Sequence, residues 1–110
     1  DDESMITNIK PDFDAVSDLD GQGLIISAHS NQYDFVSRYF CPKYGINEDP
    51  VTGSAHTTLI PYWANKLNKD SLTAKQVSKR GGELFCRNLE ERVLIGGNAV
   101  LYMKGIIEIN

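Results

Sequence analysis

The segment Gly53–Leu67 constrains the fold most, because its apolar residues recur at the three- and four-residue spacing of an α-helix. The apolar positions cover a broad face and are Ala55, Leu59, Ile60, Trp63, Ala64 and Leu67. A face this wide predicts a central helix with a sheet packed around it, and Trp63 belongs to its core. Pro61 removes one helical hydrogen bond, so we expect a kink between residues 57 and 61.

Most of the remaining chain has the patterns of short strands. We predict strands at residues 24–28, 33–40, 73–78, 83–88, 92–95 and 98–109, and one short helix at residues 12–19. The connections are short, which favours an antiparallel or mixed sheet over a doubly wound fold. The predicted fold class is therefore α+β, with a mostly antiparallel or mixed sheet wrapped around the central helix. We expect the 110 residues to form a single domain.

Composition excludes several function classes. The formal net charge of −4 argues against a nucleic-acid surface, and no apolar run approaches the roughly 20 residues that span a bilayer. Cys41 and Cys86 stand in no Cys-x-x-Cys or histidine-rich arrangement, so we expect no metal site and no disulfide framework. We interpret both cysteines as buried apolar fillers, and a reducing cytoplasm as the fitting location.

The residues before the central helix form a candidate site. Asp49 and Pro50 force a bend, and Thr52, Gly53 and Ser54 suit a helix N-terminus, whose free N–H groups favour an anion. A substrate carboxylate bound there would be stabilised by about 1 kcal/mol from the helix dipole. Asp49, close to that carboxylate, is a candidate to hold or move a proton.

The same residues also make an ordinary turn and helix cap that binds nothing, and local chemistry leaves both interpretations open. His56, one turn into the helix, either serves in packing or capping or reaches the substrate. Lys79 and Arg80 form either a solvated turn, or a contact to a substrate anion or to a missing lobe. His29 is either solvated or faces a ligand.

A longer string resembles a known family. Residues 38–63 read RYFCPKYGINEDPVTGSAHTTLIPYW, and they resemble the signature of the phenazine-biosynthesis PhzF-like family, which belongs with the diaminopimelate-epimerase-like isomerases. QVSKRGGEL at residues 76–84 and VLIGGNAV at residues 93–100 resemble the C-terminal half of the same family. The EDPVTGSA core is long and unusual in composition, so it is far more specific than a lone glycine loop.

The resemblance implies a two-lobed enzyme whose active site lies between two lobes, each a sheet wrapped around a central helix. Such enzymes use no metal or organic cofactor and move a proton by acid/base chemistry on small carboxylic acids; the named example isomerises a dihydro-hydroxyanthranilate. By the same resemblance, Asp49 matches an active-site aspartate, Gly53 and Ser54 line the substrate pocket, and Thr52 is an adjacent pocket candidate.

This chain departs from the family in one large respect: no segment resembles the N-terminal lobe, which carries the principal acid/base glutamate. The chain begins with Asp1 rather than methionine, so we expect the C-terminal lobe of a longer isomerase, inactive by itself. Its expected partners are the N-terminal lobe of the same protein and a small carboxylate substrate. The alternatives are a non-catalytic module that binds a small anion, and a half-domain that self-associates, in a homodimer for example.

Overall fold

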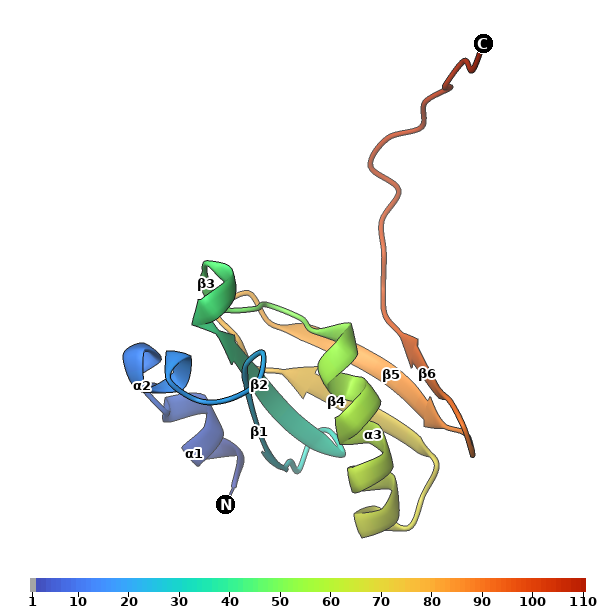
Figure 1. Cartoon of the computed structure of the whole chain (residues 1–110). Helices are drawn as coiled ribbons and strands as arrows, with labels where there is room; N and C mark the ends of the chain where they lie inside the picture. The colour runs from blue at the N-terminus through green and yellow to red at the C-terminus, as the bar shows by residue number, and fades with distance from the viewer. Residues whose placement is uncertain (1) are drawn as a thin grey trace.

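The structure, a computed structural model, describes residues 2–110 and consists of one curved sheet, one long helix and two short helices (Figure 1). The helices are α1 (Glu3–Asn8), α2 (Phe13–Ser17) and α3 (Gly53–Leu67), with a 3-10 turn η1 at Pro42–Tyr44. The strands are β1 (Leu24–His29), β2 (Phe35–Cys41), β3 (Ile46–Glu48), β4 (Ser71–Gln76), β5 (Gly82–Asn88) and β6 (Val93–Gly96).

The sheet is mixed, as predicted. Its strand order is β1-β2-β4-β5-β6, and the short β3 pairs with the end of β2. β2 and β4 run parallel, with Phe35 opposite Ala74, and the other pairs described are antiparallel. A parallel pair needs a long crossover, and α3 supplies it between β2 and β4. The α+β class is therefore confirmed.

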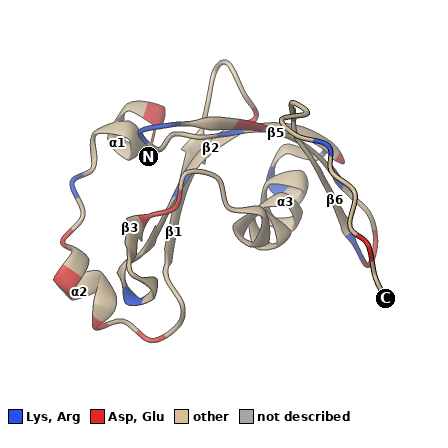
Figure 2. Cartoon of the chain, turned by 90° about the horizontal axis from the view of Figure 1, so that it is seen from above, with Lys and Arg blue, Asp and Glu red and all other residues tan. Residues whose placement is uncertain are grey.

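The central helix lies inside the curve of the sheet. Figure 2 shows α3 nearly end-on, with the sheet bending around it from β1 and β2 to β6. Five of the six predicted apolar positions of α3 are buried, and Leu67 is partly buried. The Trp63 ring stacks on Phe35 of β2 at 5.4 Å between centroids and an interplanar angle of 3°. Trp63 is thus part of the core, where each buried large apolar side chain contributes about 1.5–3 kcal/mol.

The helix α3 has the predicted bounds, and its end has a local cause. Asn68 adopts the left-handed conformation at φ 53°, and the Lys69 amide donates to the Ala64 carbonyl at 3.1 Å. This arrangement satisfies carbonyls at the helix end and stops the helix. Pro61 lies inside the helix, and the kink expected there stays a prediction.

A second, smaller core covers the opposite face of the sheet. Ile6 of α1 packs against Ala28 of β1 and Val36 of β2. The helix α1 was not predicted from the sequence, although Asp2 caps it by accepting from the Met5 amide at 3.0 Å. The sequence offers only one capping residue before a single buried apolar position, and this was too weak a signal to predict a helix. The predicted helix at residues 12–19 is present as the shorter α2.

The predicted strand at residues 98–109 is wrong. Residues 97–110 have no regular secondary structure, and they run away from the body of the protein beyond β6 (Figure 1). Their apolar side chains are highly exposed, at 92% for Val100 and 91% for Ile109. The segment is rich in apolar and β-branched residues, as strands often are, but no neighbouring strand among the described residues pairs with it. The missed β3 brings the number of strands back to six.

None of the helices formed by residues 2–110 combines the length and the apolar character needed to cross a membrane.

Candidate functional site at the start of α3

Residues 49–52, which we call the corner, connect β3 to α3. Asp49 is half-buried, and its amide donates to the Tyr39 carbonyl of β2 at 3.1 Å, so the corner begins as a continuation of the sheet. Thr52 keeps an extended backbone at φ −117° and ψ 103°, and helical conformation starts at Gly53. Pro50, which lies between Asp49 and Thr52, lacks an amide hydrogen and favours this turn.

Asp49 and Thr52 are joined by a short hydrogen bond. The Thr52 hydroxyl donates to Asp49 Oδ2 at 2.5 Å. Within the described residues, the Thr52 side chain makes no capping bond to the amides of α3, so it does not occupy the usual place of a helix cap. Gly53 and Ser54 at the start of α3 are both exposed. Amides in this first turn lack intrahelical partners, which makes the helix start receptive to an anion.

Thr52 itself is only 6% exposed, and its polar groups are engaged within the protein. Its amide donates to Gln76 Oε1 at 2.7 Å, and its hydroxyl also accepts from Gln76 Nε2 at 3.0 Å. Of the predicted binding residues, Gly53 and Ser54 therefore face outward, whereas Thr52 faces inward to Asp49 and Gln76. Contact between Thr52 and a substrate stays a prediction.

Gly53 opens into a cavity of about 560 Å³. Arg80 and the bare backbones of Gly81, Gly82, Gly96 and Gly97 contribute to its lining. A Cβ added at Gly53 would meet no atom within 4 Å, so space for a ligand lies directly against this residue. Arg80 is exposed and places a positive charge at the same cavity as the start of α3, and Glu83 places a negative charge there.

Ser54 lines a separate, smaller hollow of about 310 Å³ beside Tyr39 and Gly23. Asp49 is not among the described residues that line either cavity. The structure thus brings Asp49 to the helix start through Thr52, but Gly53 and Ser54 provide the accessible surface.

His56 is fully buried and lies below the corner. Its Nδ1 is 2.7 Å from the Thr52 carbonyl oxygen, which can only accept, so Nδ1 carries the proton. Burial lowers the pKa of His56, and the hydrogen bond to Thr52 only partly offsets this effect. The ring lies 5.9 Å from that of Phe35, between centroids. His56 therefore packs and supports the corner, as one of its two interpretations predicted.

Asp49 also affects the groups around it. Burial raises the pKa of the Cys41 thiol, and the negative charge of Asp49 raises it further. Burial likewise raises the pKa of the Cys86 thiol. Both cysteines are buried and free, which confirms their interpretation as apolar fillers.

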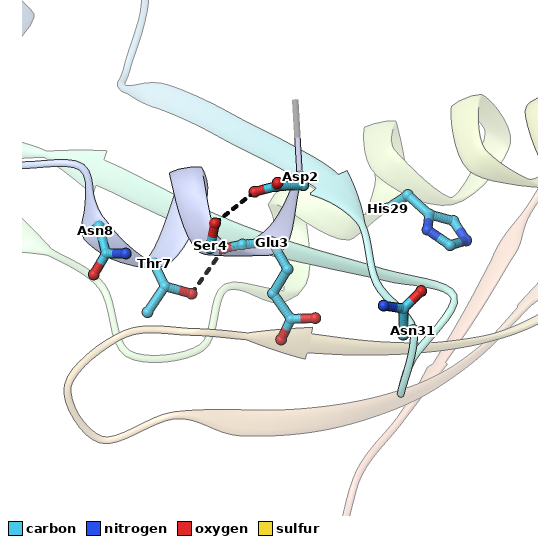
Figure 3. Close-up of a pocket in the computed structure, with 7 residues that line it drawn as sticks. All are labelled: Asp2, Glu3, Ser4, Thr7, Asn8, His29 and Asn31. Carbon is cyan, nitrogen blue, oxygen red and sulfur yellow. Dashed lines mark hydrogen bonds between the residues drawn. The ribbon is translucent and has the colours of Figure 1, made fainter.

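A different cavity, of about 540 Å³, lies between α1 and the end of β1 (Figure 3). Ser4 donates to Asp2 at 2.7 Å, and Thr7 donates to the backbone oxygen of Glu3 at 2.9 Å. His29 is exposed and lines this cavity rather than either hollow beside the corner. Because Asp2 and Glu3 carry negative charge, this cavity is a poor site for a carboxylate.

Within residues 2–110, no three His, Cys, Asp or Glu side chains come together in a way that could hold a metal ion. The expectation that no cofactor takes part stays a prediction.

Two residues that hold the corner were not recognised from the sequence as part of a site. Gln76 ends β4, and Ser78 follows it; the Ser78 hydroxyl donates to the Pro50 carbonyl at 2.8 Å. A signal for Gln76 was present, because it follows Leu72 and Ala74 at the two-residue period of an inward-facing strand side. A polar residue on such a face needs internal partners.

Comparison with known proteins identifies the family. The model of the phenazine biosynthesis-like protein family (PhzC-PhzF) matches residues 1–105. An uncharacterized isomerase of Pseudomonas aeruginosa is 55% identical over 108 residues, which are 98% of this chain and 41% of that protein. This chain belongs to the PhzF family.

Solved structures of the PhzF family share the fold. A PhzF family protein of Enterococcus faecalis has a TM-score of 0.89 and 54% identity, covering 94% of this chain and 40% of the other. A putative PhzC/PhzF protein of Clostridium difficile has a TM-score of 0.87 and 48% identity, covering 99% of this chain and 42% of the other. The chain therefore spans about two fifths of the length of these relatives.

Proposed function

We propose that this chain is the C-terminal lobe of a PhzF-like isomerase that transfers a proton on a small carboxylic acid without a cofactor. The observation that carries the proposal is the geometry of the corner. Asp49 is held by Thr52 at the start of α3, where Gly53 adjoins an open cavity and Thr52 leaves the first helical amides uncapped. The isomerase named among the relatives supports the reaction class.

In this proposal, the amides of Gly53 and Ser54 hold the substrate carboxylate, and Arg80 adds a positive charge at the cavity. Thr52 contributes indirectly, because its hydroxyl fixes one oxygen of Asp49. Asp49 then assists proton transfer on the carbon skeleton next to the bound carboxylate. We expect the principal acid/base group to come from a second lobe of the same longer protein, since relatives are more than twice as long as this chain.

The catalytic role of Asp49 can be tested in the full-length protein that carries this chain. The assay follows solvent deuterium entering a dihydro-hydroxyanthranilate, the substrate class that the family resemblance implies. We expect Asp49→Asn to reduce the rate by roughly ten- to ten-thousand-fold, as for loss of an acid/base participant. Asp70→Asn is the matched control, because it makes the same change on an exposed loop before β4. Full activity of Asp49→Asn would remove Asp49 from the mechanism.

The binding role of Gly53 has its own test. A methyl group at this position meets no protein atom, so Gly53→Ala should leave the free energy of unfolding within about 0.5 kcal/mol of wild type. The same methyl occupies the space where a carboxylate would approach the helix start. We therefore expect KM for the dihydro-hydroxyanthranilate to rise about tenfold in the full-length protein. An unchanged KM would place the carboxylate elsewhere.

The same measurements separate the alternatives. If the ligand shifts the amide signals of Gly53 and Ser54 but no deuterium enters it, the corner is a binding module rather than a catalytic site. The exposed apolar residues of the segment 98–110 favour self-association as a second candidate. Sedimentation over a range of concentrations would then reveal a dimer.

A further inference from the structure

Gln76 is a fully buried polar residue on the inner face of the sheet. It lies at the end of β4, with Leu72 and Ala74 before it on the face that packs against α3. A buried side-chain amide is costly unless its donors and acceptor are paired. The partners of Gln76 therefore show what this residue contributes to the structure.

All three hydrogen bonds of the Gln76 side chain go to the corner. Its Oε1 accepts from the Thr52 amide at 2.7 Å, while its Nε2 donates to the Asp49 carbonyl at 2.8 Å and to Thr52 Oγ1 at 3.0 Å. The orientation of the amide group is fixed by its partners, because a backbone N–H can only donate and a carbonyl can only accept. Gln76 thus ties the end of β4 to both ends of the corner.

These bonds determine where the Thr52 hydroxyl points its hydrogen. Since Gln76 Nε2 donates to Thr52 Oγ1, that oxygen accepts there and its hydrogen remains available to Asp49 Oδ2, 2.5 Å away. The result is a directed chain of donors from Gln76 through Thr52 to the Asp49 carboxylate. A hydrogen-bonded chain of this kind fixes side-chain orientation more strongly than separate bonds do.

Neighbouring residues restrain the rest of the corner. The Ser78 hydroxyl donates to the Pro50 carbonyl at 2.8 Å and accepts from the Gly81 amide at 3.0 Å. Gly81 has φ 71°, a conformation that favours glycine. A Cβ on Gly82 would come within 2.2 Å of Val51 Cγ2, so only glycine lets β5 approach the corner this closely.

We propose that Gln76 is the positioning residue of the site: through Thr52, it orients the Asp49 carboxylate and fixes the start of α3 for proton transfer. Ser78 assists by holding Pro50. The inference rests on the proposed function of Asp49, but the restraint of the corner by Gln76 can be measured separately. Gln76 touches no substrate in this mechanism and acts only through the corner.

The test uses Gln76→Met in the full-length protein, because methionine keeps the length of the side chain and removes its donors and acceptor. Leu72→Ala is the matched control: it destabilises the same strand and the same core without touching the corner. Ser78→Ala is a milder second variant in case Gln76→Met folds poorly. All variants are compared at a temperature where each is fully folded.

The first measurement is hydrogen exchange at the Thr52 amide, observed by NMR. We expect exchange to be about tenfold faster in Gln76→Met and unchanged in Leu72→Ala, since only the first loses the acceptor of this amide. Ser78→Ala should accelerate exchange by a smaller factor. Unchanged exchange in Gln76→Met overturns the positioning role, whatever the activity.

The second measurement is deuterium entry into the dihydro-hydroxyanthranilate. We expect Gln76→Met to lower kcat by roughly 10- to 100-fold with KM within about threefold, because a small displacement of a reacting group is costly. In the Asp49→Asn background, Gln76→Met should cause no further loss of kcat, although its effect on stability persists. Additive losses would show that Gln76 does not act through Asp49. If the wild-type protein shows no turnover, the proposed function fails, and Thr52 exchange alone decides whether Gln76 holds the corner.

Discussion

At the scale of residues, the site is a set of buried polar side chains whose bonds converge on four residues of backbone. Thr52 joins Asp49 to Gln76 through hydrogen bonds, and the buried His56 ring donates a hydrogen bond to the Thr52 carbonyl. The outward-facing residues Gly53 and Ser54 depend on this inner layer for their position. Substitutions in the inner layer should therefore affect chemistry without touching a ligand.

His56 gives the protein a pH-dependent stability. Burial lowers its pKa, whereas in the unfolded chain the imidazole binds a proton at about pH 6.5. Below pH 6.5 the unfolded state therefore binds more protons than the folded state, and stability falls as the pH falls toward the lower, folded-state pKa. We expect the free energy of unfolding to decrease between pH 7.5 and pH 5.5, by at most about 1.4 kcal/mol, which is the limit for a histidine that stays neutral in the folded state. Urea unfolding at several pH values measures it.

The variant His56→Gln is the control for this prediction. Glutamine does not titrate in this range, and its amide can still donate to the Thr52 carbonyl. The difference between the two pH profiles isolates the contribution of His56 from that of other groups. Parallel profiles would mean that His56 does not cause the loss of stability.

At the scale of elements, a predicted strand formed only where the chain provides a neighbouring strand to pair with it, whereas the central helix formed from its own local signals. The helix α3 was predicted with its bounds because its apolar face and its ends are encoded locally. The segment 98–109 is rich in apolar residues but forms no strand, because a strand needs hydrogen bonds from a neighbour. The short β3 forms despite a weak pattern, because β2 lies beside it.

The exposed C-terminal segment leads to a prediction about stability. Removal of residues 98–110 should change the free energy of unfolding by less than about 0.5 kcal/mol, because this segment does not pair with the sheet and its apolar side chains are exposed. Thermal and urea unfolding of the shortened chain measure this. A chain ending at residue 92 is the contrasting control, since it also loses Val93, which packs against the core. A clear loss of stability on removing residues 98–110 alone would show that they pack on the body.

At the scale of the whole molecule, the sheet encloses α3 on one side and leaves the start of that helix open. Gly53 lies against a cavity whose lining includes glycine backbones, Arg80 and Glu83. Asp49 in the corner is held by Thr52 and lines neither this cavity nor the hollow beside Ser54. This chain corresponds to about two fifths of its relatives' length. A site with one open side and an exposed apolar segment nearby is what we expect of a lobe that meets a second lobe.

The sequence alone determined the fold class, the central helix and the position of the corner. Each of these follows from local signals: the helical spacing of apolar residues, the Asp-Pro bend, and small residues at a helix start. The family followed from the long motif at residues 38–63 with two shorter stretches at residues 76–84 and 93–100, and the comparisons confirmed it. The same local signals and the same motif are enough to make Asp49, Gly53 and Ser54 candidate site residues.

Only the tertiary structure decided which residues support the site and which apolar segment has no strand to pair with among the described residues. Gln76 is 24 residues from Thr52 in the sequence, and the two meet because α3 carries the chain back to place β4 parallel to β2. The inward role of Thr52 and the packing of His56 likewise depend on contacts with other elements, Gln76 of β4 and Phe35 of β2. Hydrogen bonds between distant residues and the pairing of strands are set by how elements pack, and local sequence patterns do not contain that information.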